Sequence, residues 1–505
     1  MHFTYNIHKK DTSAPTVVKA SDELGVLNIT TTEGLPTTKP QAIMLVIDTS
    51  ASMSDRCRDG RTKFDHAKYT LIKMLEVMNT YTTVIKIAIM GFDEASNIIT
   101  EFINLNDKNI IELIKRVDEI KLGSRTNIEC ALRTIQITFA EEFDNIKDYT
   151  CTQIFMTDGE ATTGIRDNES LMQLVPDNVS KNVFIGYGLE HDSSLLTDLS
   201  KAMTNGEYRF IDEIENSGLV YGEILHSMFY NCYTNPVIKT HDCLVYDWNT
   251  NKYCNELNMN DIPYGSERSI YVSLHQDKKS TATVEFYSNN TLVHSQIMKE
   301  VTSVRDCSKA VYKLKTMMLL YEASHIGKKR GKDYIKDYQY IKTKLSAFMK
   351  RVNSYIKDNN MENNVEMKRV QDDIYIAFTA IDTPYSKMFI GARQISRGNE
   401  RAYSTGVNNI TDYACHTPLL NNFGFIQKNQ LPSRTMTVPP PIKHYDDMFI
   451  ENDYVSRNIG DIIIEDNDNP FRTYRQNAIN APTDREILLR GTSSISGIMR
   501  QVTGS

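Results

Sequence analysis

Runs of apolar residues that stop at polar side chains predict the central part of the fold. Residues 43–47 read Ile-Met-Leu-Val-Ile, and Asp48 follows directly. An unbroken apolar run of this kind predicts a strand buried on both faces, as in a parallel sheet covered by helices. A shorter run, residues 154–156, stops at Thr157 and Asp158. The pattern therefore predicts an α/β fold in which two buried strands end at acidic residues.

An alternation of apolar and polar residues predicts a second, antiparallel part of the fold. The alternation recurs over residues 235–302, in short segments separated by turn-forming residues such as the asparagines at 289–290. This spacing predicts a small β-sandwich. Strand-like segments at 16–19 and 27–31, within a lead-in over residues 1–37, are expected to complete the sandwich.

Helical periodicity follows the alternating segments. Apolar side chains recur at i, i+3, i+4 and i+7 over residues 310–321 and again over 334–349, which predicts a helical hairpin within residues 303–391. Residues 392–505 lose this periodicity and contain a run of three prolines. They are expected to form an extended tail, whose short apolar islands are either linear binding motifs or segments that fold back on the body.

Oxygen-bearing side chains follow the two buried strands and form a candidate metal site. Asp48, Ser50 and Ser52 come after the first strand, and Asp158 comes after the second. Thr126 lies in a loop just before a helical pattern. Open α/β sheets bind ligands at the carboxyl ends of their strands, so these side chains are expected to meet there. Hydroxyl and carboxylate oxygens suit a hard cation such as Mg²⁺.

Each of these residues also has an ordinary structural role. An aspartate after a strand commonly caps the following helix, which would explain Asp48 alone. Ser50 and Ser52 could bond their own backbone in a turn, Thr126 could cap a helix, and Asp158 could belong only to a turn. Their joint occurrence in one β–α pattern favours the metal site over these separate roles.

The chain resembles the von Willebrand factor type A domain family. The metal-ion-dependent adhesion site of that family consists of D-x-S-x-S, a threonine in a G-x-T-N-like loop and an aspartate in a T-D-G turn, and all three occur here in order. The resemblance covers roughly residues 38–232 and includes predicted strands at 85–92, 183–188 and 206–210. Arg125 stands where the family usually has a small residue, and it is expected to lie across the rim of the site.

The resemblance implies how such a site would work. Ser50, Ser52 and Thr126 would contact the metal through their hydroxyls, whereas Asp48 and Asp158 would hold it mainly through bound waters. Mg²⁺ is the expected cofactor, with Mn²⁺ or Ca²⁺ as alternatives. Neutral ligands leave much of the cation's charge unneutralised, so an Asp or Glu carboxylate of a partner protein is attracted. The expected function is non-enzymatic, metal-dependent protein–protein interaction.

Other functions compete with this one. His191-Asp192 is the nearest candidate catalytic pair, but adjacent residues rarely face one another, and a loop histidine is expected instead. The whole layout resembles intracellular A-domain proteins of eukaryotes and large DNA viruses, with a following β module and helices. The alternatives are therefore a substrate-recruiting subunit of a ubiquitin-ligase or ATPase assembly, or a structural virion or assembly component.

Composition narrows the class of protein. The chain has 505 residues and a net charge of −7 at pH 7, which argues against general nucleic-acid binding. No segment approaches the ~20 apolar residues of a membrane span, and the amino terminus lacks the apolar run of a signal peptide. The eight cysteines are scattered without a C-x-x-C pair, which argues against a zinc site or a disulfide framework. A cytoplasmic protein is expected, or one of the host cytoplasm or the virion if it is viral.

The expected fold class is α/β, with a Rossmann-like, doubly wound and mostly parallel sheet, an accessory β-sandwich, a helical hairpin and an extended C-terminal tail. The sequence indicates neither the oligomeric state nor the identity of the partner. The predicted parts, in chain order, are a β lead-in (1–37), an A domain (38–232), a β-sandwich module (235–302), a helical region (303–391) and a largely irregular tail (392–505).

Overall fold

The structure of the protein is a computed structural model. It divides the chain into two compact units, the second of which contains residues 319–391. The residues that the structure describes are 2–8, 22–32, 34–57, 60–142, 148–188, 191–203, 205–211, 217–275, 282–297, 308–326, 332–381 and 385–400.

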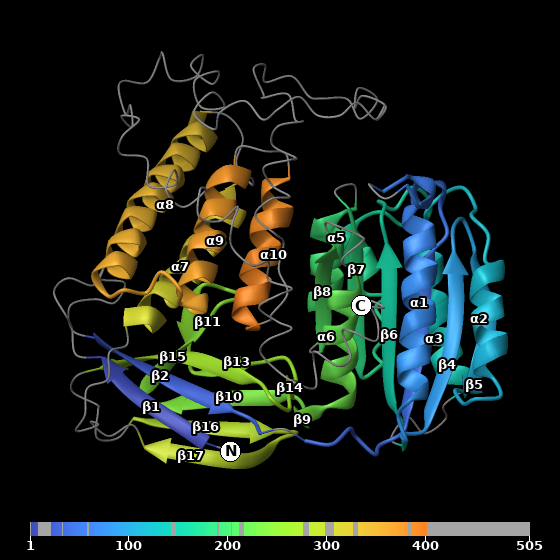
Figure 1. The fold of residues 1–505 in the computed structure, drawn as a ribbon, viewed down its shortest axis with the longest axis horizontal. Helices are drawn as coiled ribbons and strands as arrows, with labels where there is room; N and C mark the ends of the chain where they lie inside the picture. Colours follow the sequence, from blue (N-terminus) through green and yellow to red (C-terminus); the bar gives the residue numbers. More distant parts are fainter. Residues whose placement is uncertain are drawn as a thin grey trace. The chain divides into compact units, whose positions relative to one another are not determined.

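A six-stranded sheet carries the predicted site in the first unit (Figure 1). The strand order is β5-β4-β3-β6-β7-β8, and all neighbours are parallel except β4 and β5. The strands are β3 (Gln41–Asp48), β4 (Ile85–Phe92), β5 (Ser96–Asn104), β6 (Thr150–Thr157), β7 (Lys181–Tyr187) and β8 (Gly206–Ile211). The two apolar runs of the sequence form β3 and β6 at the centre of this sheet, and the predicted α/β fold class is confirmed.

Helices cover both faces of this sheet (Figure 1). Side chains of α1 (Lys63–Asn79), α2 (Ile110–Glu119) and α6 (Ser217–Phe229) share one buried core with alternate residues of β3, β4, β6 and β7. On the opposite face lie α3 (Ile128–Glu142) and α5 (Ser193–Lys201). A short 3-10 helix, η1 (Ala51–Ser54), and α4 (Asn168–Met172) complete this part.

Two antiparallel sheets form a β-sandwich in the same unit. Their strand orders are β1-β2-β15-β11-β12 and β13-β10-β16-β17. Residues of both sheets, among them Ile29, Val272 and Phe286, share one buried core. The strands are β1 (His2–His8), β2 (Asp22–Thr30), β10 (Pro236–His241), β11 (Cys243–Asp247), β12 (Lys252–Cys254), β13 (Glu256–Asn258), β15 (Glu267–His275), β16 (Thr283–Ser288) and β17 (Thr291–Ile297), with a separate pair, β9 (Asn231–Tyr233) and β14 (Ile262–Pro263).

The amino-terminal segment is part of the sandwich. β2 pairs antiparallel with β15 along its whole length, from Thr30 opposite Glu267 to Asp22 opposite His275. The predicted strand at 27–31 coincides with the end of β2, whereas the predicted strand at 16–19 lies outside the described residues.

The β16–β17 hairpin offers a local test of the fold. Asn289 and Asn290 both have positive φ, 47° and 61°, as a two-residue type I′ turn requires. Asn290→Ala is expected to lower the free energy of unfolding by about 1 kcal/mol, because alanine is disfavoured in the left-handed region. Asn290→Gly is expected to leave the stability unchanged. Urea unfolding measures both variants, and equal stabilities would contradict the left-handed turn.

Helices account for most of the described residues after β17. Val311 and Leu314 of α7 (Ser308–Ser324) pack against Val26 and Tyr271, on the face of the β2–β15 sheet that points away from the sandwich core. In the second unit, α8 (Lys332–Asp358) packs against α9 (Val365–Ala380).

The last described helix, α10 (Ser386–Gly398), continues past residue 391, where the sequence pattern predicts the helical region to end. The rest of the predicted tail, from residue 401 onward, lies outside the described residues. Across the described part of the chain, every helix is too short or too polar to cross a bilayer.

Candidate metal centre

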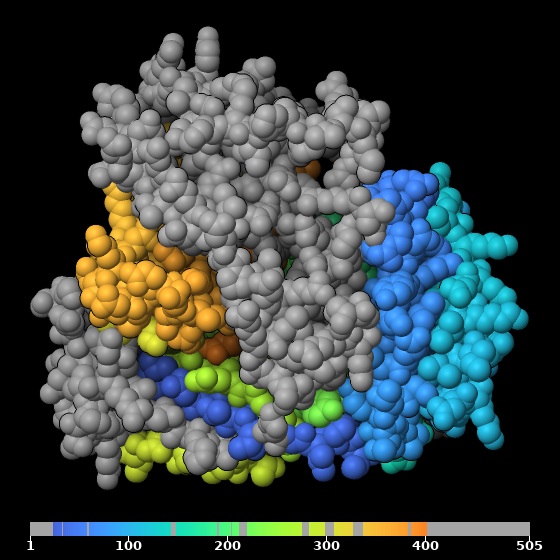
Figure 2. Space-filling model, in the orientation of Figure 1, coloured from blue at the N-terminus to red at the C-terminus, as the bar shows by residue number. Residues whose placement is uncertain are grey.

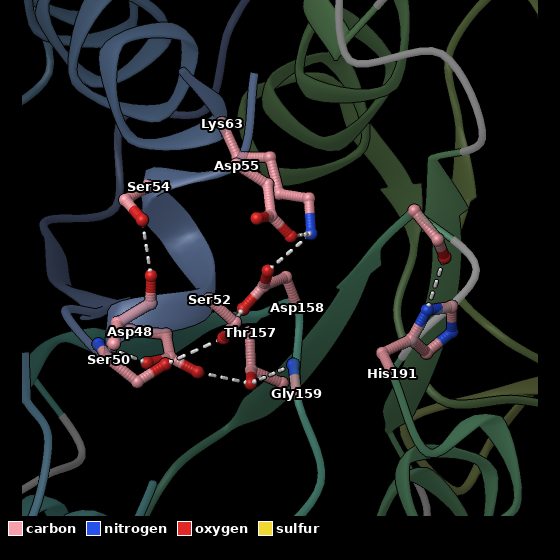
Figure 3. A network of polar contacts seen from close by, with 12 residues as sticks. Asp48, Ser50, Ser52, Ser54, Asp55, Lys63, Thr157, Asp158, Gly159 and His191 are labelled. Atoms are coloured by element: carbon pink, nitrogen blue, oxygen red, sulfur yellow. Dashed lines mark hydrogen bonds and ion pairs between the residues drawn. The ribbon is translucent and has the colours of Figure 1, made fainter. Parts of the chain in front are cut away.

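The predicted site residues of the D-x-S-x-S motif and of the T-D-G turn are joined by a chain of hydrogen bonds at the carboxyl ends of β3 and β6 (Figure 3). The backbone N–H of Ser50 donates to Oδ1 of Asp48 at 2.8 Å. The hydroxyls of Ser50 and Ser52 lie 3.1 Å apart, and Ser52 donates to Oδ1 of Asp158 at 2.7 Å. The parallel pairing of β3 with β6 brings these two acidic residues to one edge of the sheet.

Thr126 comes to the same place from the loop that precedes α3. The backbone N–H of Gly123 donates to the carbonyl of Thr49 at 2.6 Å, which ties this loop to the residues after β3. A Cβ atom placed on Gly159 would lie 3.4 Å from Oγ1 of Thr126 and 3.6 Å from Oγ of Ser52. Both hydroxyls therefore face the small residue of the T-D-G turn, and all five predicted site residues are brought together.

The two carboxylates of this cluster are buried. Asp48 and Asp158 are both 0% exposed. Burial is the main cause that raises the pKa of Asp48 to about 7, and the nearby Asp158 raises it further, while hydrogen bonds from Ser50 and Thr157 act in the opposite direction. A cation close to Asp48 would favour its charged form.

Two residues that bond to the site carboxylates were not predicted from the sequence as site residues. Oγ1 of Thr157 donates to Oδ2 of Asp48 at 2.5 Å, so the threonine of the T-D-G turn fixes the orientation of the carboxylate of the other strand. Nζ of Lys63 donates to Oδ2 of Asp158 at 2.7 Å and to Oδ2 of Asp55 at 3.2 Å (Figure 3). Thr157 could have been found from its place at the end of a buried strand, whereas no spacing pattern points to Lys63.

His191 and Asp192 do not face one another. Nδ1 of His191 lies 2.7 Å from the carbonyl oxygen of Gly188, and Nε2 lies 2.7 Å from the hydroxyl of Tyr208. The carboxylate of Asp192 accepts a hydrogen bond from the backbone N–H of Leu195 at the start of α5. The expected loop histidine is therefore a buried residue with both ring nitrogens engaged, and it bonds to Gly188 and Tyr208 rather than to Asp48 or Asp158 (Figure 3).

Arg125 extends from the same loop as Thr126. Its Nε lies 3.4 Å from a carboxylate oxygen of Glu94, and both side chains are exposed. Ser124 donates to the same oxygen at 3.2 Å. The bulky residue that departs from the family pattern is thus held by an acidic neighbour from the β4–β5 turn.

The donor atoms of the cluster fit a hard cation. Three hydroxyls and two carboxylates supply only oxygen, which Mg²⁺ and Ca²⁺ prefer, whereas structural zinc sites take mainly sulfur and nitrogen. In the parts of the chain that the structure describes, there is no group of three or more His, Cys, Asp or Glu residues able to hold a metal. A metal ion at the five-residue cluster would therefore depend on the serine and threonine hydroxyls.

One comparison with known proteins identifies a family for part of this chain. A search of curated proteins found no match. The solved structures that are similar to this chain include a von Willebrand factor type A protein from Catenulispora acidiphila, with 12% identity over 73% of this chain and 89% of that chain and a TM-score of 0.47. The ArnB paralog VWA2 from Sulfolobus acidocaldarius has 13% identity over 79% of this chain and 97% of that chain, with a TM-score of 0.45. Proximal thread matrix protein 1 from the mussel byssus, with a zinc-occupied MIDAS motif, has 17% identity over 40% of this chain and 52% of that chain, with a TM-score of 0.32. The family model for the von Willebrand factor type A domain matches residues 42–221. Residues 42–221 of this chain therefore form a von Willebrand factor type A domain.

Proposed function

We propose that the A domain binds a divalent cation, Mg²⁺, and through it an Asp or Glu side chain of a partner protein. A domains commonly mediate protein–protein interaction, and many bind a divalent metal at this position. The observation that carries the proposal is the meeting of three hydroxyls and two buried carboxylates at one edge of the sheet. The residues that would hold the cation are Asp48, Ser50, Ser52, Thr126 and Asp158.

The charges around the site favour an anionic partner. Asp48 and Asp158 carry one negative charge each when ionised, and the ammonium of Lys63 offsets one of them. A divalent cation would leave the cluster with a net positive charge of one. When bound, the cation offers a Lewis-acidic position to a carboxylate, and opposite charges attract strongly where water is excluded. The partner surface is therefore expected to be acidic.

We also propose that the site binds and does not catalyse. His191, the histidine of the candidate catalytic pair, is buried, and its ring nitrogens are bonded to Gly188 and Tyr208. The hydroxyl of Ser52 donates to the carboxylate of Asp158, but this carboxylate also accepts from Lys63 and is a proposed metal ligand, so it is not free to act as a general base.

Metal binding can be tested by thermal unfolding. Mg²⁺ is expected to raise the melting temperature of the parent chain and to leave that of Asp48→Ala unchanged, because the variant lacks a carboxylate of the site. Binding only to the native state stabilises by about 2.7 kcal/mol at a hundredfold excess of ligand over Kd. Scanning calorimetry with Mg²⁺, Mn²⁺, Ca²⁺ or EDTA measures the effect and ranks the metals.

Asp167→Ala is the matched control for this test. Asp167 caps α4 by accepting a hydrogen bond from the backbone N–H of Ser170, so its loss costs stability without touching the cluster. This variant is expected to melt lower than the parent and to keep the full metal response. A parent that shows no metal response would overturn the proposed function. A metal response without Mg²⁺-dependent capture of a partner would favour the structural alternative.

A further inference from the structure

Lys63 occupies an unusual position for a lysine. It is the first residue of α1, after the capping residue Thr62, and the positive end of the helix dipole disfavours a cation there. Its side chain is nevertheless only 12% exposed. The backbone N–H of Lys63 donates to the carbonyl of Asp55 at 2.9 Å, which fixes where the side chain leaves the helix. A buried ammonium at this end of a helix requires nearby carboxylates.

Among the residues that the structure describes, the carboxylates of Asp55 and Asp158 lie near this ammonium, and that of Asp158 is buried. Oδ2 of Asp158 lies 2.7 Å from Nζ of Lys63 and belongs to a fully buried side chain (Figure 3). Oδ2 of Asp55 lies 3.2 Å away and belongs to a side chain that is 56% exposed. Ion pairs with exposed groups contribute little, whereas a buried charge that loses its partner is costly. The pair with Asp158 is therefore the important one.

Both oxygens of Asp158 are occupied by donors of the protein. Oδ1 accepts from Ser52 and Oδ2 accepts from Lys63. The ammonium thus bonds directly to a carboxylate of the proposed metal site, and it places a positive charge within that site. A second positive charge, from a metal ion, would be repelled by it at short range.

We propose that Lys63 is the resident counter-ion of Asp158, which stabilises the metal-free site and weakens its affinity for divalent cations. The first half of this proposal stands on the ion pair alone, and the second half rests on the proposed function. The lysine allows the two buried carboxylates to coexist without a metal, so the domain stays folded when the metal leaves. It also raises the dissociation constant of the cation, so the metal leaves the site at a higher concentration of free cation.

The counter-ion role is tested without any metal. Melting temperatures of Lys63→Met, Asp158→Asn and the double variant are measured in EDTA. Lys63→Met is expected to lower the melting temperature of the parent clearly, because Asp158 is left buried and unpaired. The same change in the Asp158→Asn background is expected to have a much smaller effect. Equal effects in both backgrounds would overturn the counter-ion role.

The effect on metal affinity is tested by titration calorimetry with Mg²⁺. Lys63→Met is expected to tighten Mg²⁺ binding by about tenfold or more, because a nearby unit of positive charge is removed. Lys63→Arg keeps the charge and is expected to bind Mg²⁺ like the parent. Lys63→Gln keeps a hydrogen-bond donor for Asp158 without the charge, and it serves as the neutral variant if Lys63→Met does not fold.

Lys73→Met is the matched control on the same helix. Nζ of Lys73 lies 2.7 Å from a carboxylate oxygen of Glu76, also on α1. The outward side of α1 forms part of the blue surface in Figure 2. This control is expected to leave Mg²⁺ affinity unchanged. If the parent binds Mg²⁺ and the neutral variants Lys63→Met and Lys63→Gln bind it no more tightly, the proposed effect of Lys63 on affinity is wrong. Absence of binding in the parent and in these variants alike would overturn the proposed function and this effect together, while the measurement in EDTA still decides the counter-ion role.

Discussion

Replacing Arg209 by methionine is expected to lower the free energy of unfolding by about 3–5 kcal/mol. Arg209 lies on β8, the edge strand of the six-stranded sheet, and is only 7% exposed. Its Nη1 donates to a carboxylate oxygen of Glu223 on α6 at 2.7 Å, and its Nε pairs with Glu207. Both glutamates are buried, so the variant removes the guanidinium that lies between two interior carboxylates, while Nζ of Lys181 remains 3.5 Å from Glu207. Guanidinium chloride unfolding at neutral pH measures the loss.

The control for this prediction is an exposed arginine pair. Nε of Arg116 lies 2.9 Å from a carboxylate oxygen of Glu112 one turn earlier on α2, and both side chains are about half exposed. Arg116→Met is expected to change the stability by no more than about 0.5 kcal/mol. Adding Glu223→Gln to Arg209→Met is expected to recover part of the loss, because one of the two buried negative charges beside the missing guanidinium is removed. A loss no larger than that of Arg116→Met would contradict the buried ion pair.

The sequence around Arg209 shows why this network could not be predicted. β8 reads Gly-Glu-Tyr-Arg-Phe-Ile, an alternation that is typical of a strand with one solvent-exposed face. In the structure, Ile211 and α6 share a buried core on the face that carries Glu207 and Arg209. Burial of that face depends on a helix later in the chain, and local periodicity carries no information about it.

The proposed metal site was more predictable, because most of it is local. Asp48 ends β3, Ser50 and Ser52 follow it directly in the chain, and the parallel pairing of β3 with β6 brings Asp158 to the same edge. The partner of Asp158 is different, since Lys63 is 95 residues away in the sequence and reaches it only because α1 begins there. Motifs thus identified the acidic and hydroxyl groups of the cluster and missed the group that balances their charge.

The accessory parts show the same division between local and distant information. Alternation and the asparagine turn at 289–290 predicted antiparallel strands, and both are present in the structure. The strand order was not predictable, because β2 lies between β1 and β15, and β15 is more than two hundred residues further along the chain. Pairing of such distant strands depends on how whole sheets bury their apolar faces.

His191 is expected to make the fold sensitive to acid. Burial is the main cause that lowers the pKa of His191 from 6.5 to about 4, and the nearby charge of Lys63 lowers it further. The ring packs so closely on β7 that a Cβ atom on Gly186 would lie 2.2 Å from it. The carbonyl of Gly188 can only accept, so Nδ1 donates to it and Nε2 accepts from the hydroxyl of Tyr208, as a neutral imidazole does.

The sign of this effect follows from the lowered pKa. Between pH 6.5 and pH 4 the unfolded chain binds a proton at His191 that the folded chain does not, so the stability due to His191 is present above pH 6.5 and is lost as the pH falls. The loss amounts to about 3 kcal/mol at pH 4. It is measured as the stability of the parent minus that of His191→Gln, by urea unfolding at a series of pH values.

The difference in stability between the parent and His191→Gln must be used, because Asp48 changes the stability with pH in the opposite direction. Its pKa is raised from 3.8 to about 7, so between these values the folded state keeps a proton that the unfolded state loses, and stability falls as the pH rises. In the parent alone the two effects largely cancel over this range. Asp48 is common to both proteins, and with EDTA present its contribution drops out of the difference. A difference that stays constant from pH 7 to pH 4 would show that His191 is protonated in the folded state as readily as in the unfolded chain.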